Sequence, residues 1–214
     1  MARDELWDAV DTHRSTTIDL LTGLDAPAWS TPSLCDGWTV RDVAGHLTMI
    51  GLSRGAIARI AVRHLGPTNR LIRESARDLA RRSEPAEIVE QLRAIVGQRA
   101  TMPGLGVEDL LVDVIAHLHD IALPLGQTPA VPLADLALAA DHAAGYRGRT
   151  AKVFRQLPWR GHRLVATDHH WASGDGPEIR GPMRDLFLLV TGRVSRPGDL
   201  TGPGVDALRS TLTT

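Results

Sequence analysis

The stretch VEDLLVDVIAHLHDIALPLG at residues 107–126 decides the fold prediction. Its apolar spacing predicts a helix from about residue 107 to 123, which ends near Pro124 and Gly126. Residues four apart lie on the same face of a helix, so Asp113 and His117 are expected to stack. The stretch therefore predicts one structural helix that also carries a carboxylate and an imidazole side by side.

A second stretch, GWTVRDVAGHL at residues 37–47, predicts another helix. Thr39 is a good N-cap, and Asp42 three residues later completes a capping box with Asp in place of the usual Glu. The helix is expected to continue to about residue 65, before Gly66-Pro67. If it faces the first helix, it presents His46 to Asp113 and His117.

The remaining sequence predicts more helices and, near the carboxyl end, a small α/β region. The segment HRLVATDHHWASG favours a strand, GDGP a turn, and EIRGP a short strand that pairs back. Helices are expected at about 3–24, 68–82, 85–100 (with Pro85 in its first turn), from residue 133 onward, at 182–191 and at 204–211. We predict a mainly α fold: a four-helix bundle with extra short helices at residues 1–155, and a small α/β extension packed on it at 156–214.

The composition is that of an ordinary globular protein and excludes several classes. Of 214 residues, 43% are hydrophobic and 23% charged, and the formal net charge is −1. This charge gives no electrostatic basis for binding nucleic acid or an anionic membrane. The amino terminus lacks the apolar core of a signal peptide, and the single cysteine, Cys35, excludes an internal disulfide. We expect a cytoplasmic protein, either a monomer or a homodimer.

Two imidazoles and a carboxylate are the usual ligands of a catalytic divalent metal, and they leave coordination positions open. His46, Asp113 and His117 form such a set. Zinc fits these donors, while Fe²⁺ or Ni²⁺ remain alternatives. Asp120, three residues after His117, could orient that imidazole or could be a solvated charge. An Asp and a His four apart are also common as a simple hydrogen-bonded pair.

Three motifs resemble the mycothiol-dependent maleylpyruvate isomerase family of actinobacteria, within the DinB-like metal-binding bundles. The first is AWSTPSLCDGWTVRDVAGHL at 28–47, and the second is DVIAHLHDIALPLG at 113–126. The third is RLVATDHHWASGDGPEIRGPMRDLFLLVTGR at 163–193, which is similar to the family's strand, turn and helix ending in Gly-Arg. The resemblance spans almost the whole chain.

The resemblance implies that His46, Asp113 and His117 are the metal ligands and that mycothiol is the cofactor or cosubstrate. It implies thiol transfer to a small electrophile, or cis–trans isomerisation of one. Asp113 stands where the family pattern has Glu, and His119 stands where many relatives have Trp. The alternative function is a non-catalytic bundle that binds a metal or a small ligand, which the change from Glu to Asp motivates.

Several other residues are weaker candidates for a site. Cys35 could be a nucleophile near a helix start, but a single cysteine is commonly a small buried hydrophobe. Trp38 and His119 are weak candidates for contacting the cofactor, although Trp38 and Trp29 are more typical of packing anchors. Arg180 and Arg193 could bind a substrate carboxylate or could be surface ion-pair members. His169 and His170 would point to opposite faces of a strand, which makes them a poor chelating pair.

Overall fold

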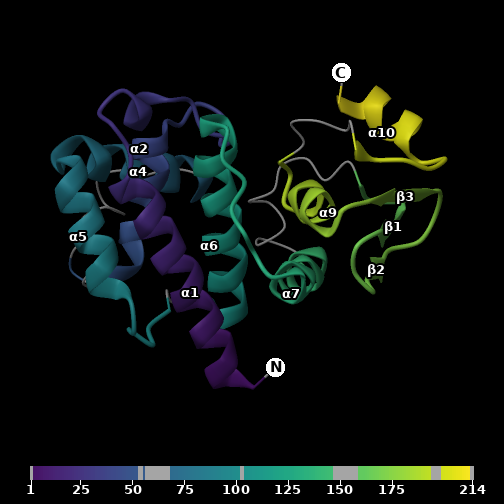
Figure 1. Cartoon of the computed structure of the whole chain (residues 1–214), viewed down its shortest axis with the longest axis horizontal. Helices are drawn as coiled ribbons and strands as arrows, with labels where there is room; N and C mark the ends of the chain where they lie inside the picture. Colours follow the sequence, from purple (N-terminus) through teal and green to yellow (C-terminus); the bar gives the residue numbers. More distant parts are fainter. Residues whose placement is uncertain are drawn as a thin grey trace. The chain divides into compact units, whose positions relative to one another are not determined.

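The structure of the chain, a computed structural model, is mainly helical with a small sheet near the carboxyl end (Figure 1), as predicted. It describes residues 2–52, 55, 68–101, 104–146, 159–193 and 199–212. The chain forms two compact units, residues 1–129 and residues 130–214. Among the described residues, no helix combines the length and the apolar composition needed to cross a bilayer.

The first unit is built around a ring of four helices. Its helices are α1 (Arg3–Thr22), α2 (Val40–Leu47), α4 (Thr68–Arg82), α5 (Pro85–Ile95) and α6 (Val107–Ala122). α1 and α2 each pack against both α5 and α6, which closes the ring, and α4 packs against α2. This arrangement is the predicted four-helix bundle, in which each helix buries one apolar stripe in a shared core.

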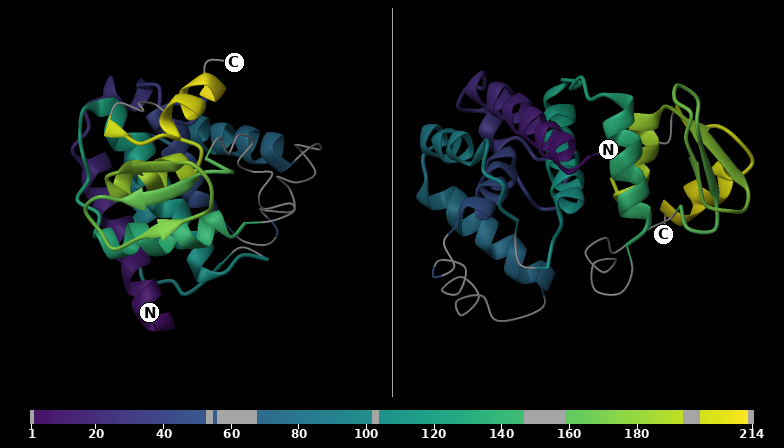
Figure 2. Two further views of the ribbon diagram at one scale, coloured as in Figure 1. Left: turned by 90° about the vertical axis from the view of Figure 1, so that its right-hand side faces the viewer. Right: turned by 90° about the horizontal axis from the view of Figure 1, so that it is seen from below.

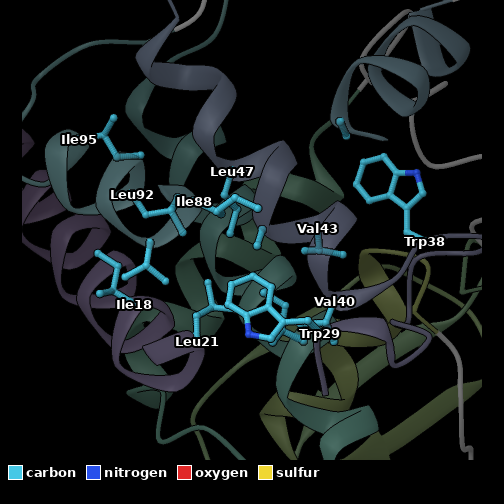
Figure 3. Packing of buried hydrophobic residues seen from close by; sticks show 14 residues of the cluster. Ile18, Leu21, Trp29, Trp38, Val40, Val43, Leu47, Ile88, Leu92 and Ile95 are labelled. Carbon is cyan, nitrogen blue, oxygen red and sulfur yellow. The ribbon is translucent and has the colours of Figure 1, made fainter. Parts of the chain in front are cut away.

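Buried side chains from α1, α2, α4, α5 and α6 and from the segment before α2 fill this core (Figure 3). Leu21 of α1, Val43 of α2, Ile88 of α5 and Ile121 of α6 are each at most 1% exposed. α6 is buried on nearly every side, which explains its almost continuous apolar sequence. Such tight packing fixes the positions of α2 and α6 and hence of the polar side chains that they carry.

α2 begins as predicted. The Thr39 hydroxyl accepts a hydrogen bond from the Asp42 amide at 3.2 Å, and the Asp42 carboxylate accepts one from the Thr39 amide at 2.9 Å. The adjacent helix α4 approaches α2 closely, because a Cβ at Gly45 would lie only 3.0 Å from the Ala76 carbonyl oxygen. The capping box and this close approach together fix the helix that carries His46.

The predicted continuation of this helix to residue 65 is wrong in its first part. The α-helix ends at Leu47, a 3-10 turn covers Thr48–Gly51, and Leu52 is extended. The backbone at Gly51 passes close to α5, since a Cβ there would lie 2.8 Å from Ile95 Cγ2. This long-range contact has no signal in local periodicity. Residues 53, 54 and 56–67 lie outside the described part of the chain.

The second unit contains helices around a three-stranded sheet, which Figure 2 shows in two further views. Its elements are α7 (Leu133–Ala144), β1 (Arg163–Ala166), β2 (Ala172–Ser173), β3 (Glu178–Gly181), α9 (Met183–Val190) and α10 (Val205–Leu212). The strand order is β2-β1-β3. α9 packs on β1 and β3 and also against α7.

The strand pairing differs from the prediction. The expected single strand is two strands, and β1 pairs with β2 in antiparallel orientation. β3 pairs with β1 in parallel, with Leu164 opposite Ile179. The GDGP segment passes close to the residues just before β1, since a Cβ at Gly176 would collide with the Gly161 carbonyl. Gly176 has φ 120°, a conformation that favours glycine. The chain therefore reaches the far edge of β1 instead of turning back on β2.

The helix after Pro132 belongs to the second unit rather than to the bundle, where we had expected it. α7 packs on α9, and Asp141 of α7 accepts a hydrogen bond from the Trp171 indole at 2.8 Å. The predicted domain boundary at 155/156 lies outside the described residues, which resume at 159. That boundary stays a prediction.

Candidate metal centre

The three predicted metal ligands lie together inside the first unit. His46, near the end of α2, and His117, on α6, each direct Nε2 at the same carboxylate oxygen, Oδ1 of Asp113. Both Nε2–Oδ1 distances are 3.4 Å. All three donor atoms lie within 4.8 Å of one another. The structure thus brings these residues together from two helices, 67 positions apart for His46 and Asp113.

The 3.4 Å spacing suits a shared cation better than a direct ion pair. A charged N–H···O⁻ hydrogen bond is about 2.7–2.9 Å long. Donors bound tetrahedrally to one ion, each about 2.0–2.2 Å from it, lie about 3.3–3.6 Å apart. Each imidazole nitrogen therefore lies from the Asp113 oxygen at the separation that a tetrahedral site requires, and a site with these three ligands would leave one coordination position open to a small molecule.

The cluster is buried on the imidazole side and open at the carboxylate. The exposed fractions of the side chains are 9% for His117, 16% for His46 and 41% for Asp113. A pocket of about 30 Å³ adjoins Asp113 inside the bundle, with Leu47, Ile50 and Arg14 in its lining. This volume holds about one or two water molecules. The pocket is too small to enclose a thiol cofactor.

The charges of this cluster stabilise one another. Burial raises the pKa of the Asp113 carboxyl, but the imidazoles of His117 and His46 lower that pKa by more, and the net pKa is well below its usual range. Burial lowers the pKa of His117, whereas the charge of Asp113 and the hydrogen bonds that His117 makes with Asp113, Asp120 and Cys35 raise it well above the usual range. A carboxylate among imidazoles gains from positive charge, which a divalent cation would also supply.

Asp120 contacts His117 at Nδ1, the ring nitrogen that does not face Asp113. Its Oδ2 lies 2.8 Å from His117 Nδ1, and the carboxylate is fully buried. A carboxylate only accepts hydrogen bonds, so Nδ1 carries a proton, and Nε2, which faces Asp113, is the nitrogen that would bind a cation once it is deprotonated. The structure thus places Asp120 where the predicted orienting role requires it.

Cys35 joins this network, a position that the sequence analysis did not anticipate. Its thiol donates to Asp120 Oδ2 at 3.1 Å, and its sulfur lies 3.8 Å from His117 Nδ1. We had considered Cys35 only as a nucleophile or a buried hydrophobe. Cys35 and Asp120 are 85 positions apart, so no local spacing could have indicated their contact.

Trp38 lies beside both histidines. The centroid of its ring is 5.4 Å from that of His46 and 6.3 Å from that of His117. The ring is 8% exposed and belongs to the core cluster of the bundle (Figure 3). Trp38 is therefore a packing residue that also covers one side of the candidate centre, while its predicted contact with a cofactor stays a prediction.

The other candidates have different surroundings. His119 is buried and bonded through Nδ1 to the Ile115 carbonyl at 2.8 Å, and it is outside the three-residue cluster. In the second unit, the Arg180 guanidinium pairs with Glu178, and that of Arg193 donates to the Thr191 carbonyl. Their predicted roles in binding a cofactor or a substrate carboxylate stay predictions.

The histidine pair after β1 lies in the bend between β1 and β2, not in a strand as expected. His169 is partly exposed and His170 is exposed. Neither belongs to a group of potential metal ligands found among the described residues.

Comparisons with known proteins agree with this architecture. Residues 10–109 match the family model described as "Mycothiol maleylpyruvate isomerase N-terminal domain". The chain is similar to the crystal structure of a mycothiol-dependent maleylpyruvate isomerase, with a TM-score of 0.65 and 14% identity over 95% of this chain and 93% of that one. The structure of a mutant of such an isomerase matches with the same values. No curated protein matches the chain.

Proposed function

The chain belongs, through residues 10–109, to the mycothiol maleylpyruvate isomerase N-terminal domain family, and from that premise we propose a divalent-metal-dependent, thiol-dependent enzyme. Its cofactor or cosubstrate would be mycothiol. Its reaction would be cis–trans isomerisation of a small electrophile or transfer of the thiol to one. The solved structures to which the chain is similar are mycothiol-dependent maleylpyruvate isomerases.

One observation carries this proposal: two imidazole nitrogens lie at 3.4 Å from one carboxylate oxygen, at the partly exposed end of a buried cluster. His46, Asp113 and His117 would hold the cation. Zinc suits this donor set, and Fe²⁺ or Ni²⁺ are the alternatives. A divalent cation here would stabilise the thiolate form of a low-molecular-weight thiol at neutral pH. The thiolate is a nucleophile for an electron-poor alkene or another electrophile.

The protein's own residues prepare this chemistry. Asp120 accepts a hydrogen bond from His117 Nδ1–H, so that Nε2 is the nitrogen that would act as a ligand. Trp38 covers the two imidazole rings on one side and limits the access of water there. The exposed side of Asp113 leaves an approach for the thiol and the electrophile.

The shorter carboxylate at position 113 does not favour the non-catalytic alternative. We considered that alternative because the family resemblance implies a glutamate at this position. Asp113 Oδ1 nevertheless lies at the same distance, 3.4 Å, from both imidazole nitrogens. This equal spacing supports the proposal that Asp113 would be a ligand despite its shorter side chain.

Metal analysis tests the site directly. Protein purified without chelator should contain about one divalent metal ion per chain, and His46→Ala and His117→Ala should each lose it. His170→Ala is the matched control, because this histidine is exposed and lies outside the cluster. Full metal content in both cluster variants would contradict the proposal.

Turnover tests the reaction. The metal-loaded protein should isomerise maleylpyruvate, or consume another cis-alkene or electrophile from a panel, only when mycothiol is present. Absorbance or chromatography would follow the reaction. Equal turnover without any thiol would rule out the thiol-dependent mechanism, and retention of activity in His117→Ala would separate the reaction from this site.

A further inference from the structure

The loop at residues 33–38 leads into α2 and contacts α6, the two helices that carry the candidate ligands. The Leu34 amide donates to the Asp120 carbonyl of α6 at 3.2 Å. The loop is held internally by Ser33, whose hydroxyl accepts from the Cys35 amide and donates to the Trp38 carbonyl. Within this loop, the Cys35 thiol donates a hydrogen bond to the Asp120 carboxylate. The loop therefore positions one thiol beside a buried carboxylate.

From this contact we infer that Cys35 is a positioning residue for the metal centre and acts on His117 through Asp120. A fully buried carboxylate needs donors, and the donors to Asp120 Oδ2 include the His117 Nδ1–H and the Cys35 thiol. The thiol restrains the Asp120 carboxylate in the orientation in which the carboxylate accepts the hydrogen bond from His117 Nδ1–H. In this way the loop helps to keep Nδ1 bonded to Asp120, so that Nε2 is the nitrogen of His117 that would face a bound cation.

Two other roles for Cys35 fit the distances less well. As a protein nucleophile it would need a free base, but the Asp120 carboxylate already accepts a hydrogen bond from His117 Nδ1–H, and that imidazole nitrogen carries the proton. As a metal ligand together with His117 Nδ1 and Asp120, it would need donors about 3.3–3.6 Å apart. The 2.8 Å between His117 Nδ1 and Asp120 Oδ2 is instead the length of a charge-assisted hydrogen bond.

This inference rests on the proposed metal site, and a double-mutant cycle of zinc affinity tests it. Competition with a chromophoric chelator would measure the affinity of the full chain. Cys35→Ala should lower the affinity by about tenfold, at the lower end of the 10–100-fold range of changes in outer-shell partners. Cys35→Ser keeps a donor and should recover part of that loss. Ser30→Ala, a similar truncation at an exposed position before the loop, should leave the affinity unchanged.

The cycle is completed in the Asp120→Ala background. Because Cys35 acts through Asp120, adding Cys35→Ala there should change the affinity less than twofold. A loss of the same size in both backgrounds would overturn the inference, and so would an unchanged affinity in Cys35→Ala. A sulfur-to-metal charge-transfer band in the cobalt-substituted protein that disappears in Cys35→Ala would also overturn it, because Cys35 would then be a ligand.

Nuclear magnetic resonance of the metal-free protein separates this inference from the proposed function. The His117 Nδ1–H should give a downfield signal that exchanges slowly with water, and exchange should become several-fold faster in Cys35→Ala but not in Ser30→Ala. If the wild-type chain bound neither zinc nor cobalt, the proposed function would fail, yet this signal would still decide the role of Cys35. An identical signal in Cys35→Ala would refute it.

Discussion

The two imidazoles of the candidate centre reach the same carboxylate oxygen but are held in different ways. His117 is bonded through Nδ1 to the buried Asp120, which also accepts the Cys35 thiol. His46 Nδ1 is buried and has no hydrogen-bond partner among the residues that the structure describes. His46 is held by packing, because its ring lies against Trp38 and its helix packs closely on α4.

The difference shows two ways of orienting a metal ligand. A hydrogen bond to Nδ1 fixes both the tautomer and the rotation of an imidazole, whereas packing fixes only the position of the ring. We therefore expect His117 to be the pre-organised ligand and His46 to be the one that adjusts when a cation binds. The experiments below test this asymmetry.

Removing either imidazole should have the largest effect. His117→Ala and His46→Ala should each lower zinc affinity more than 100-fold, beyond the range of outer-shell changes. His117→Ala should also destabilise the metal-free protein more than His46→Ala does, by about 1–3 kcal/mol, because it removes a donor from the buried carboxylate of Asp120.

Chelator competition and urea unfolding of the metal-free variants would measure these two effects. Equal loss of stability in the two variants would mean that the two histidines are held alike. His170→Ala again serves as the control, because its side chain is exposed.

Replacing Asp120 by Asn should have the next largest effect, a loss of about 10–100-fold in zinc affinity. The amide can donate to His117 Nδ1, which would move the imidazole proton to Nε2, the nitrogen that faces Asp113. Glu108→Gln, on the same helix, removes a carboxylate outside this network and is the control. An affinity of Asp120→Asn equal to that of the wild type would show that the tautomer of His117 needs no partner.

Zinc affinity should fall with decreasing pH. The cation needs an unprotonated Nε2, and the pKa of His117 is raised despite its burial, by Asp113 first and then by its hydrogen bonds. Below that pKa, zinc affinity should fall about tenfold for each pH unit, because one proton competes with the cation for Nε2. Above it the affinity should level off.

Titration calorimetry in buffers with different ionisation enthalpies would count the protons released. In Asp120→Asn the fall in affinity should begin at a lower pH, because removing this acceptor lowers the pKa of His117. A pH dependence identical to that of the wild type would contradict the role assigned to Asp120.

Trp38→Phe should have the smallest effect, a loss of about two- to fivefold in zinc affinity, since packing constrains a ligand less than a hydrogen bond does. The smaller ring would leave the His46 ring less restrained. Trp29→Phe, in the same core cluster, is the control for stability, and the two variants should unfold at similar urea concentrations. A loss as large as that of Asp120→Asn would show that packing orients His46 as strongly as hydrogen bonding orients His117.

Local sequence was enough to predict most of the helices and half of the site. The stacking of Asp113 on His117, the position of Asp120 one turn later and the capping box at Thr39 and Asp42 all depend on residues three or four apart. Helical geometry alone brings such residues together. The break at Leu47 and the parallel pairing of β3 with β1 escaped prediction, because they depend on contacts with distant segments.

The sequence by itself determined a helical bundle and the imidazole–carboxylate pair on one face of α6. Only the tertiary structure decided that His46 meets this pair and that Cys35 reaches Asp120. These contacts join residues 67 and 85 positions apart, and they follow from how α2 and the loop before it pack on α6. Periodicity identifies which face of a helix is buried, but the packing of side chains in the core selects the partner of that face.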